Sequence, residues 1–243
     1  MSKEHVLIIG GSSSIGCEVI RQIAHKNMVI LAQFYANADG LNQLAKEVSA
    51  PIIPVQTDLL SDDAVETMLG TIEGRCSFPE KIVFLAAPRF ALIRFKELAW
   101  SDFQTHLDIQ LRAAVLVCNR FLPKMAAAKT GKLVFVLSSY TLNLPPAAMA
   151  HYVTAKYAML GLMKALASEY AAKKICINAV SPSMVESGFL SNIPDKLVEL
   201  TADQHPLKRN AVPKDVAPMI RFLLSDDANY ITGVNVPITG GAA

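Results

Sequence analysis

The sequence predicts an α/β fold built on a doubly wound parallel sheet of seven strands, with helices on both faces. Short apolar runs alternate along the chain with longer stretches of helical length. Most of the runs contain several β-branched residues, which suits strands that are buried on both faces. Parallel strands need long crossover connections, and the stretches between the runs are long enough to supply them as helices.

Each element can be placed from these patterns. Strands are expected at residues 6–9, 28–32, 52–55, 82–87, 133–137, 175–180 and 234–238, and helices at 15–26, 37–48, 62–73, 101–128, 151–173 and 213–224. Ser61 supplies a capping hydroxyl before the third helix, and Pro213 fits the first position of the last one. No repeat, low-complexity tract or linker divides the sequence, so residues 1–243 are predicted to form one domain.

The composition excludes several classes of protein. The chain has 243 residues, of which 52% are hydrophobic, so it can bury a large core and is not disordered. A net charge of +2 argues against a strong electrostatic nucleic-acid binder. No apolar run approaches the ~20 residues of a membrane span, and the run at 6–9 is too short for a signal peptide. The four cysteines are widely spaced, which indicates reduced thiols in a cytoplasmic protein and no metal site.

The first strand is followed by a glycine- and serine-rich turn. Gly10, Ser12, Ser13, Ser14, Ile15 and Gly16 form this turn and open the first helix. Glycines let the backbone approach a pyrophosphate, and the helix N-terminus supplies N–H donors and positive charge. No Gly-Lys-Ser/Thr follows, so a Walker A loop is excluded. The position of the turn indicates a Rossmann-type dinucleotide site.

The end of the second strand carries information about the cofactor. NAD sites usually place an acid there to hold the ribose hydroxyls, and none follows this strand directly. Gln33, Tyr35 or Asn37 could instead hydrogen-bond a 2′-phosphate, which favours NADP(H) and leaves NAD(H) possible. Phe34 either flanks the adenine or belongs to the core.

Tyr152 and Lys156 are four residues apart on a predicted helix and share one of its faces. A nearby ammonium favours a phenolate, so we expect Lys156 to lower the pKa of Tyr152. The phenol would then exchange a proton near neutral pH. Ser139 would lie at the end of the fifth strand and orient a carbonyl or hydroxyl group of the substrate.

With these motifs the sequence resembles the short-chain dehydrogenases/reductases, and among them the FabG-like 3-oxoacyl-[acyl-carrier-protein] reductases. The resemblance covers essentially the whole chain. It rests on the glycine turn, Asp58 after the third strand, Ser139 thirteen residues before Tyr152, Lys156, the segment Asn178-Ala179-Val180-Ser181-Pro182, and Tyr230-Ile231-Thr232-Gly233 with Gly240-Gly241.

The resemblance implies a role for each matching residue. Tyr152 would be the catalytic acid/base, Lys156 its pKa modifier and a ribose ligand, and Ser139 the residue that orients the carbonyl. Asp58 and Leu59 would contact the adenine. The segment from Pro182 to Ser187 would pass over the nicotinamide, with the Val185 backbone and the Ser187 hydroxyl near its carboxamide.

Four positions depart from the family pattern. Ser14 replaces a glycine of the turn, and Ser183 replaces the glycine of the usual Pro-Gly. Ala86, Ala87 and Pro88 stand in place of most of the usual Asn-Asn-Ala-Gly, and Pro88 removes a backbone donor. Gln110 replaces the asparagine that is the fourth catalytic residue. Tolerated drift explains these changes, or they reduce catalysis and make the chain depend on an active partner subunit.

Residues 183–210 are predicted to form a substrate lid beside the nicotinamide. Five side chains are expected to face an apolar cleft without a charge for an acid: Phe90, Leu144, Pro145, Met149 and Met184. His151 is expected to point off the catalytic face. The long helices at 101–128 and 151–173 pack between subunits in this family, which implies a homotetramer or dimer.

The sequence therefore predicts an NADP-preferring ketoreductase of 3-oxoacyl thioesters. Lys129 and Lys173 match basic positions that dock the acyl carrier protein in the family, although lysines at helix ends are also common as solvated, dipole-compensating residues. Two alternatives stay open: an NAD-dependent alcohol dehydrogenase of the same family, and a weakly catalytic cofactor-binding subunit of a hetero-oligomer.

Overall fold

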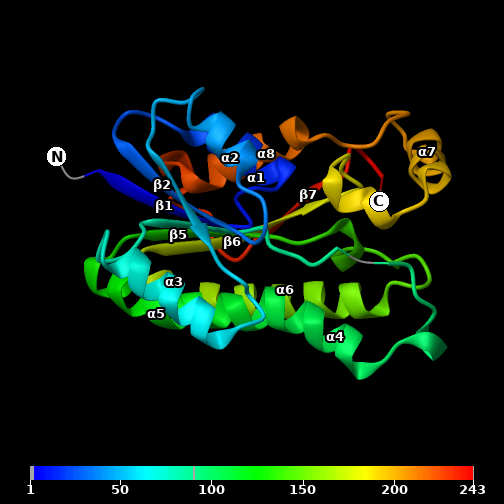
Figure 1. The fold of residues 1–243 in the computed structure, drawn as a ribbon, viewed down its shortest axis with the longest axis horizontal. Coiled ribbons are helices and arrows are strands. Elements are labelled where there is room, and N and C mark those ends of the chain that lie inside the picture. The colour runs from blue at the N-terminus through cyan, green and yellow to red at the C-terminus, as the bar shows by residue number, and fades with distance from the viewer. Residues whose placement is uncertain (1–2, 90, 243) are drawn as a thin grey trace.

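The computed structural model describes residues 3–89 and 91–242 and contains a seven-stranded, all-parallel sheet (Figure 1). The strands lie in the order β3-β2-β1-β4-β5-β6-β7. They are β1 (Glu4–Ile9), β2 (Met28–Phe34), β3 (Ile52–Gln56), β4 (Lys81–Phe84), β5 (Gly131–Val136), β6 (Ile175–Pro182) and β7 (Asn235–Ile238). The order reverses between β1 and β4, so the predicted doubly wound fold is confirmed.

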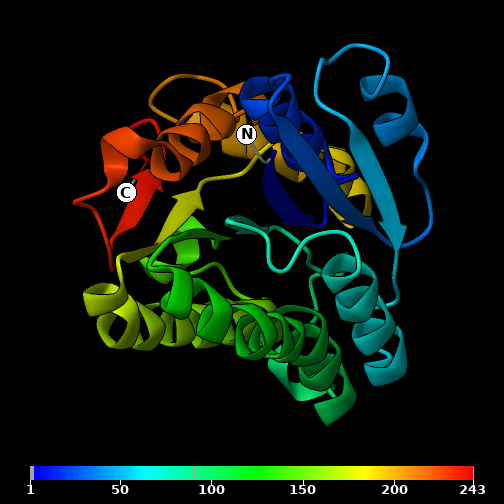
Figure 2. The same cartoon turned by 90° about the vertical axis from the view of Figure 1, so that its left-hand side faces the viewer.

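Helices cover both faces of the sheet (Figures 1 and 2). They are α1 (Ser14–Ile23), α2 (Asp39–Leu44), α3 (Asp62–Glu73), α4 (Trp100–Leu107), α5 (Ala113–Ala128), α6 (Ala150–Tyr170), α7 (Asp195–Gln204) and α8 (Pro213–Leu224). The helices α3, α5 and α6 bury Leu69, Phe121 and Met163 against one face. The helices α1, α2 and α8 bury Ile20 and Ile220 against the other.

The helix predicted at residues 101–128 is interrupted. It starts at Trp100, ends as an α-helix at Leu107, passes through a π-helical turn at Asp108–Arg112, and resumes as α5. A π-turn accommodates an extra residue and rotates the side chains that follow it, and such turns are frequent at functional sites. The side-chain pattern is helical throughout, so the sequence gives no sign of this change.

The segment predicted as a lid contains a short 3₁₀ helix at Gly188–Asn192 and the helix α7. In Figure 1 it lies at the right, beyond the carboxyl ends of the strands. None of the helices in residues 3–89 and 91–242 combines the length and the hydrophobicity needed to cross a membrane. The four cysteines are free thiols.

Candidate active site

A cleft of about 1020 Å³ opens at the carboxyl ends of the strands and collects most of the predicted site residues. Those that line it are Gly10, Ser12, Ser13, Ser14, Ile15, Phe34, Tyr35, Asp58, Leu59, Ala86, Ala87, Pro88, Ser139, Tyr152, Lys156, Pro182, Ser183, Val185 and Ser187. Gly16 and Gln110 are both buried and do not line it.

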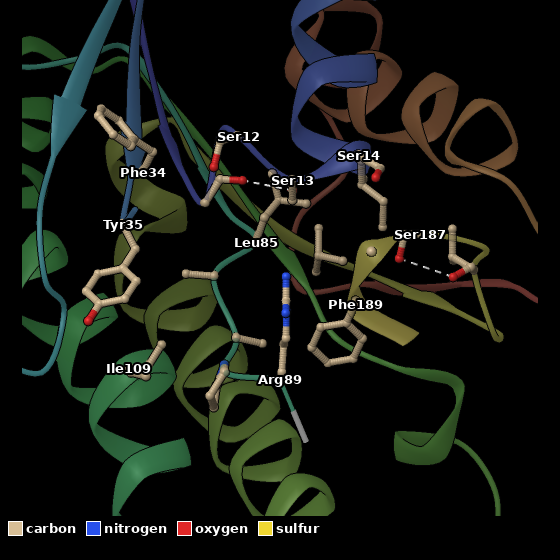
Figure 3. A pocket seen from close by; sticks show the side chains of 18 of the residues that line it. Ser12, Ser13, Ser14, Phe34, Tyr35, Leu85, Arg89, Ile109, Ser187 and Phe189 are labelled. Carbon is tan, nitrogen blue, oxygen red and sulfur yellow. Dashed lines mark hydrogen bonds between the residues drawn. The ribbon is translucent and has the colours of Figure 1, made fainter. Parts of the chain in front are cut away.

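The turn after β1 is held by its own hydrogen bonds. Ser13 caps α1, because its Oγ accepts from the Gly16 N–H at 3.0 Å and donates to the Gly10 carbonyl at 2.8 Å. Gly10 has a φ of 85°, and a Cβ there would lie 2.7 Å from the Ala86 nitrogen. The turn therefore requires glycine at residue 10, and Ser12, Ser13 and Ser14 surround one end of the cleft (Figure 3).

Gly16 serves packing and does not reach the cleft. A Cβ at this position would lie 2.6 Å from the Gly11 carbonyl oxygen. The missing side chain lets α1 start directly against the turn. Gly16 therefore positions the helix N-terminus that lines the cleft, and its predicted part in cofactor binding stays a prediction.

The Gln33 side chain connects this turn to the segment after β3 through two hydrogen bonds. Its Oε1 accepts from the Gly10 N–H at 2.8 Å, and its Nε2 donates to the Thr57 carbonyl at 2.9 Å. The side chain is buried with both ends of its amide in use. Gln33 also lines the cleft, but its Oε1 and one N–H of its Nε2 are already engaged, so binding of a 2′-phosphate by this residue stays a prediction.

The part of the cleft beyond β2 and β3 contains exposed aromatic and acidic groups. Tyr35 is 66% exposed, and Phe34 both lines the cleft and packs on the core, so its two alternative roles coexist. The Asp58 carboxylate accepts from the Leu60 N–H at 2.9 Å. Asp39, the first residue of α2, also lines this end. An acid is therefore present after all, a few residues beyond the end of β2, where the sequence pattern did not place it.

Tyr152 and Lys156 lie together at the other end of the cleft. The Lys156 Nζ is 5.6 Å from the centroid of the Tyr152 ring and donates to the Val136 carbonyl at 2.9 Å. Burial lowers the pKa of Lys156 to about 7. The Tyr152 hydroxyl forms a hydrogen bond with Ser138.

The pKa of Tyr152 is raised to about 12, chiefly by burial, although the hydrogen bond from Ser138 opposes this shift. The expected lowering by Lys156 is therefore wrong for the chain by itself. The physical reason is that Lys156 is desolvated as well, so its own charge is disfavoured, and its ammonium is directed to Val136.

Two serines follow β5, and both line the cleft. Ser139, which the spacing to Tyr152 selects, begins a 3₁₀ turn and is half-buried. Ser138 is buried, and its Oγ accepts a hydrogen bond from the Tyr140 N–H at 3.3 Å. It is this serine, and not Ser139, that forms the hydrogen bond with Tyr152. Sequence reasoning missed Ser138 because the family spacing points to its neighbour.

Gln110 lies in the π-turn, and its neighbour Ile109 faces the cleft instead. The Gln110 Nε2 is 3.3 Å from the Nδ1 of His106, while its Oε1 is buried without a partner among the described residues. The His106 ring meets the ring of His151 edge-on at 4.8 Å and that of Tyr152 at 6.0 Å. Burial, aided by His151 and Lys156, lowers the pKa of His106 to about 4.

The substrate end is less apolar than the sequence suggests. Met184, Leu190 and Phe189 line it, and the Phe189 ring lies 6.2 Å from that of Tyr152. Arg89 lines it too, so the expectation of a cleft without a cation for an acid is wrong.

The remaining residues expected at the substrate end are placed elsewhere. Leu144 is 94% exposed, and neither it nor Pro145 nor the buried Met149 reaches the cleft. Phe90 lies outside the described residues. His151 is buried and does not line the cleft. Over residues 3–89 and 91–242, no three His, Cys, Asp or Glu side chains gather in a way that would hold a metal ion.

A family model described as enoyl-(acyl carrier protein) reductase matches residues 10–243. The chain belongs to the short-chain dehydrogenase/reductase family. This assigns it to an oxidoreductase family whose members use nicotinamide cofactors.

Curated relatives agree with this membership, and solved structures share the fold. The 3-oxoacyl-[acyl-carrier-protein] reductase FabG of Staphylococcus epidermidis is 27% identical over 240 residues, which cover 97% of both chains. Levodione reductase superposes with a TM-score of 0.90 at 24% identity, covering 99% of this chain and 98% of that one. YwfH, a reductase involved in bacilysin biosynthesis, gives 0.88 at 20% identity, covering 100% and 99%. The last two likenesses establish the fold.

Proposed function

We propose that this protein is an NAD(P)H-dependent carbonyl reductase that converts 3-oxoacyl thioesters, carried on acyl carrier protein, to 3-hydroxyacyl products. The observation that carries the proposal is the buried Tyr152 in the large cleft, with its hydroxyl hydrogen-bonded to Ser138 and its ring 5.6 Å from the Lys156 Nζ. One domain, residues 1–243, would hold cofactor and substrate together. The similarity of the whole chain to FabG proteins supports the substrate class.

The residues present fit a dinucleotide. Gly10, Ala86 and Ala87 keep the floor of the cleft free of large side chains, and the start of α1 offers its N–H groups. Asp58 and Leu59 would hold the adenine, and Val185 with Ser187 the carboxamide. When bound, the nicotinamide supplies the hydride.

The chain itself supplies the proton and holds the substrate. The Tyr152 hydroxyl protonates the carbonyl oxygen as the carbonyl carbon becomes a CH–OH group. Ser139 donates a hydrogen bond that orients this oxygen and stabilises its developing charge, while Ser138 holds the Tyr152 hydroxyl in place. The Lys156 ammonium favours the phenolate left on Tyr152 and binds ribose hydroxyls. Gln110 remains our fourth catalytic residue, acting from the π-turn behind Ile109.

We propose NADP(H) as the preferred cofactor, with NAD(H) possible. Tyr35 and Asn37 offer polar groups to a 2′-phosphate at the exposed end of the cleft. Asp39 opposes this preference, since a carboxylate repels the phosphate and suits ribose hydroxyls. The preference therefore depends on which of these groups faces the ribose.

Lys129 and Lys173 would dock the carrier protein, because they match the basic positions that do so in the FabG-like reductases. They precede β5 and β6, at the amino ends of the strands, whereas the cleft opens at the carboxyl ends. A strand of six residues spans about 20 Å, which separates the two edges within one chain. Docking at these lysines would therefore serve the cleft of a neighbouring subunit, and we propose a homotetramer or dimer.

A second candidate is a cofactor-binding subunit with weak catalysis of its own. Gln110 does not line the cleft and its Oε1 is unpaired among the described residues, which favours this candidate. The deciding experiment is NADPH oxidation by the purified protein with a short 3-oxoacyl thioester. Turnover supports the reductase. Cofactor binding without turnover supports the subunit.

A further inference from the structure

Arg89 is a cation in the cleft that the mechanism above does not use. It follows Pro88 in the loop after β4 and lines the cleft with Phe189 and Leu85. Figure 3 shows its side chain extending into the middle of the pocket, with the guanidinium away from the loop. Its position places a positive charge where cofactor and substrate would meet.

The guanidinium has no acidic partner in the described parts of the chain, residues 3–89 and 91–242. Arg21, Arg112 and Arg120 are each paired with an Asp or Glu. The Asp58 carboxylate in the cleft accepts a hydrogen bond from its own loop at Leu60. Arg89 is therefore available to a ligand.

The surroundings make this cation effective. Arg89 is exposed, so a ligand can reach it, and a ligand bound against the apolar Ile109, Met184 and Leu190 would displace water and strengthen a charge–charge interaction. A guanidinium presents several N–H donors in a planar fork that matches a carboxylate or a phosphate. The adjacent Pro88 has no backbone N–H, so Arg89 also restores donors to this loop.

We propose that Arg89 binds an anionic oxygen group inside the cleft, either a phosphate of the dinucleotide or an acidic group of the carbonyl substrate. This inference rests on the proposed reductase function. It specifies that the cofactor or the substrate of the reductase presents an anionic oxygen group to Arg89. Both sources share the same chemistry, a bidentate guanidinium–oxyanion pair, and the experiment separates them.

The test compares Arg89→Gln with Arg94→Gln, which removes the same charge from an exposed position outside the cleft. Calorimetry measures binding of inorganic pyrophosphate and of NADPH to each protein. Initial rates give KM for a short oxo acid and for its methyl ester. A charge-assisted pair corresponds to about a ten- to hundredfold change in affinity.

Two results support the proposal. Weaker binding of pyrophosphate and NADPH in Arg89→Gln alone identifies the cofactor phosphate. Unchanged NADPH binding with a raised KM for the oxo acid, but not for the ester, identifies a substrate anion. Arg89→Gln behaving like Arg94→Gln in every assay overturns the inference. If no ketone is reduced by the parent protein but Arg89→Gln still loses pyrophosphate binding, the proposed function fails and this inference holds.

Discussion

The Nζ atom of Lys156 lies 5.6 Å from the centre of the Tyr152 ring, and both side chains are buried at the end of the cleft. Lys156 is anchored by its hydrogen bond to the Val136 carbonyl, and Tyr152 by its bond with Ser138. The pair is therefore held in place by β5 and the loop that follows it, before any ligand arrives.

Replacing Tyr152 by Phe removes the proton donor and leaves the ring that packs beside Phe189. We expect turnover of a 3-oxoacyl thioester to fall by at least about hundredfold. Affinity for NADPH, measured by fluorescence titration, should change little. Near-normal rates in this variant would contradict the proposed mechanism.

Binding of the cofactor should take up a proton at Lys156. The pKa of this amine is about 7, so at pH 7.5 it is mostly neutral in the free chain. Negative phosphates entering the same cleft favour the ammonium and raise the pKa. Calorimetry in buffers of different ionisation enthalpy should report uptake of about half a proton or more. A binding enthalpy that is independent of the buffer, or unchanged uptake in Lys156→Met, would rule this out.

Replacing Gln33 by Leu should weaken both folding and cofactor binding. The variant leaves the half-buried Gly10 N–H and the buried Thr57 carbonyl without these partners. Each lost partner costs about 1–3 kcal/mol, so we expect the free energy of unfolding in urea to fall by about 2 kcal/mol or more. Gln56→Leu, which removes an exposed bond to the Tyr35 carbonyl, is the matched control. Equal stability of the two variants would exclude a bracing role for Gln33.

Removing the Asp39 carboxylate should shift cofactor preference further toward NADPH. In Asp39→Asn the repulsion of a 2′-phosphate is lost, and we expect the Kd for NADPH to fall by about three- to tenfold, with the Kd for NADH unchanged or raised. Asp203→Asn, on the exposed side of α7, controls for net charge. If NADPH binds Asp39→Asn no more tightly than the parent, Asp39 does not face the ribose.

The sequence could predict the features that depend on local pattern. The β-branched runs predict the strands, and the glycine turn and the pair of Tyr152 and Lys156 predict the two ends of the cleft. Gln33 was missed as a brace because its partners Gly10 and Thr57 are more than twenty residues away along the chain. Arg89 was missed because nothing in its neighbours indicates whether its side chain turns inward.

The π-helical turn could not be predicted from the sequence for a different reason. Asp108–Arg112 continue the helical pattern on both sides, and the extra residue is visible only in the backbone. Its effect is to present Ile109 to the cleft and to turn Gln110 toward His106. Alignment with the family pattern could locate Gln110 but could not show which way its amide points.

His106 is a neutral, buried imidazole, and its pKa of about 4 makes the fold sensitive to acid. An unfolded histidine has a pKa of about 6.5. Between these values the unfolded chain binds a proton that the folded chain does not, so stability is retained above pH 6.5 and is lost as the pH falls toward 4.

Replacing His106 by Phe should therefore reduce the loss of stability in acid. From pH 7.5 to pH 5.0, the contribution of His106 to this loss is about 2 kcal/mol. We expect urea unfolding of His106→Phe, at constant protein concentration, to show a pH dependence smaller by about that amount. The comparison uses the change in the free energy of unfolding between the two pH values within each protein. The cost of losing the contact between His106 and Gln110 is the same at both pH values and therefore cancels. His25→Gln, which changes a half-exposed imidazole, should keep the full pH dependence. An identical fall in stability in the parent and in His106→Phe would assign the acid sensitivity to other groups, such as His151, whose pKa burial also lowers.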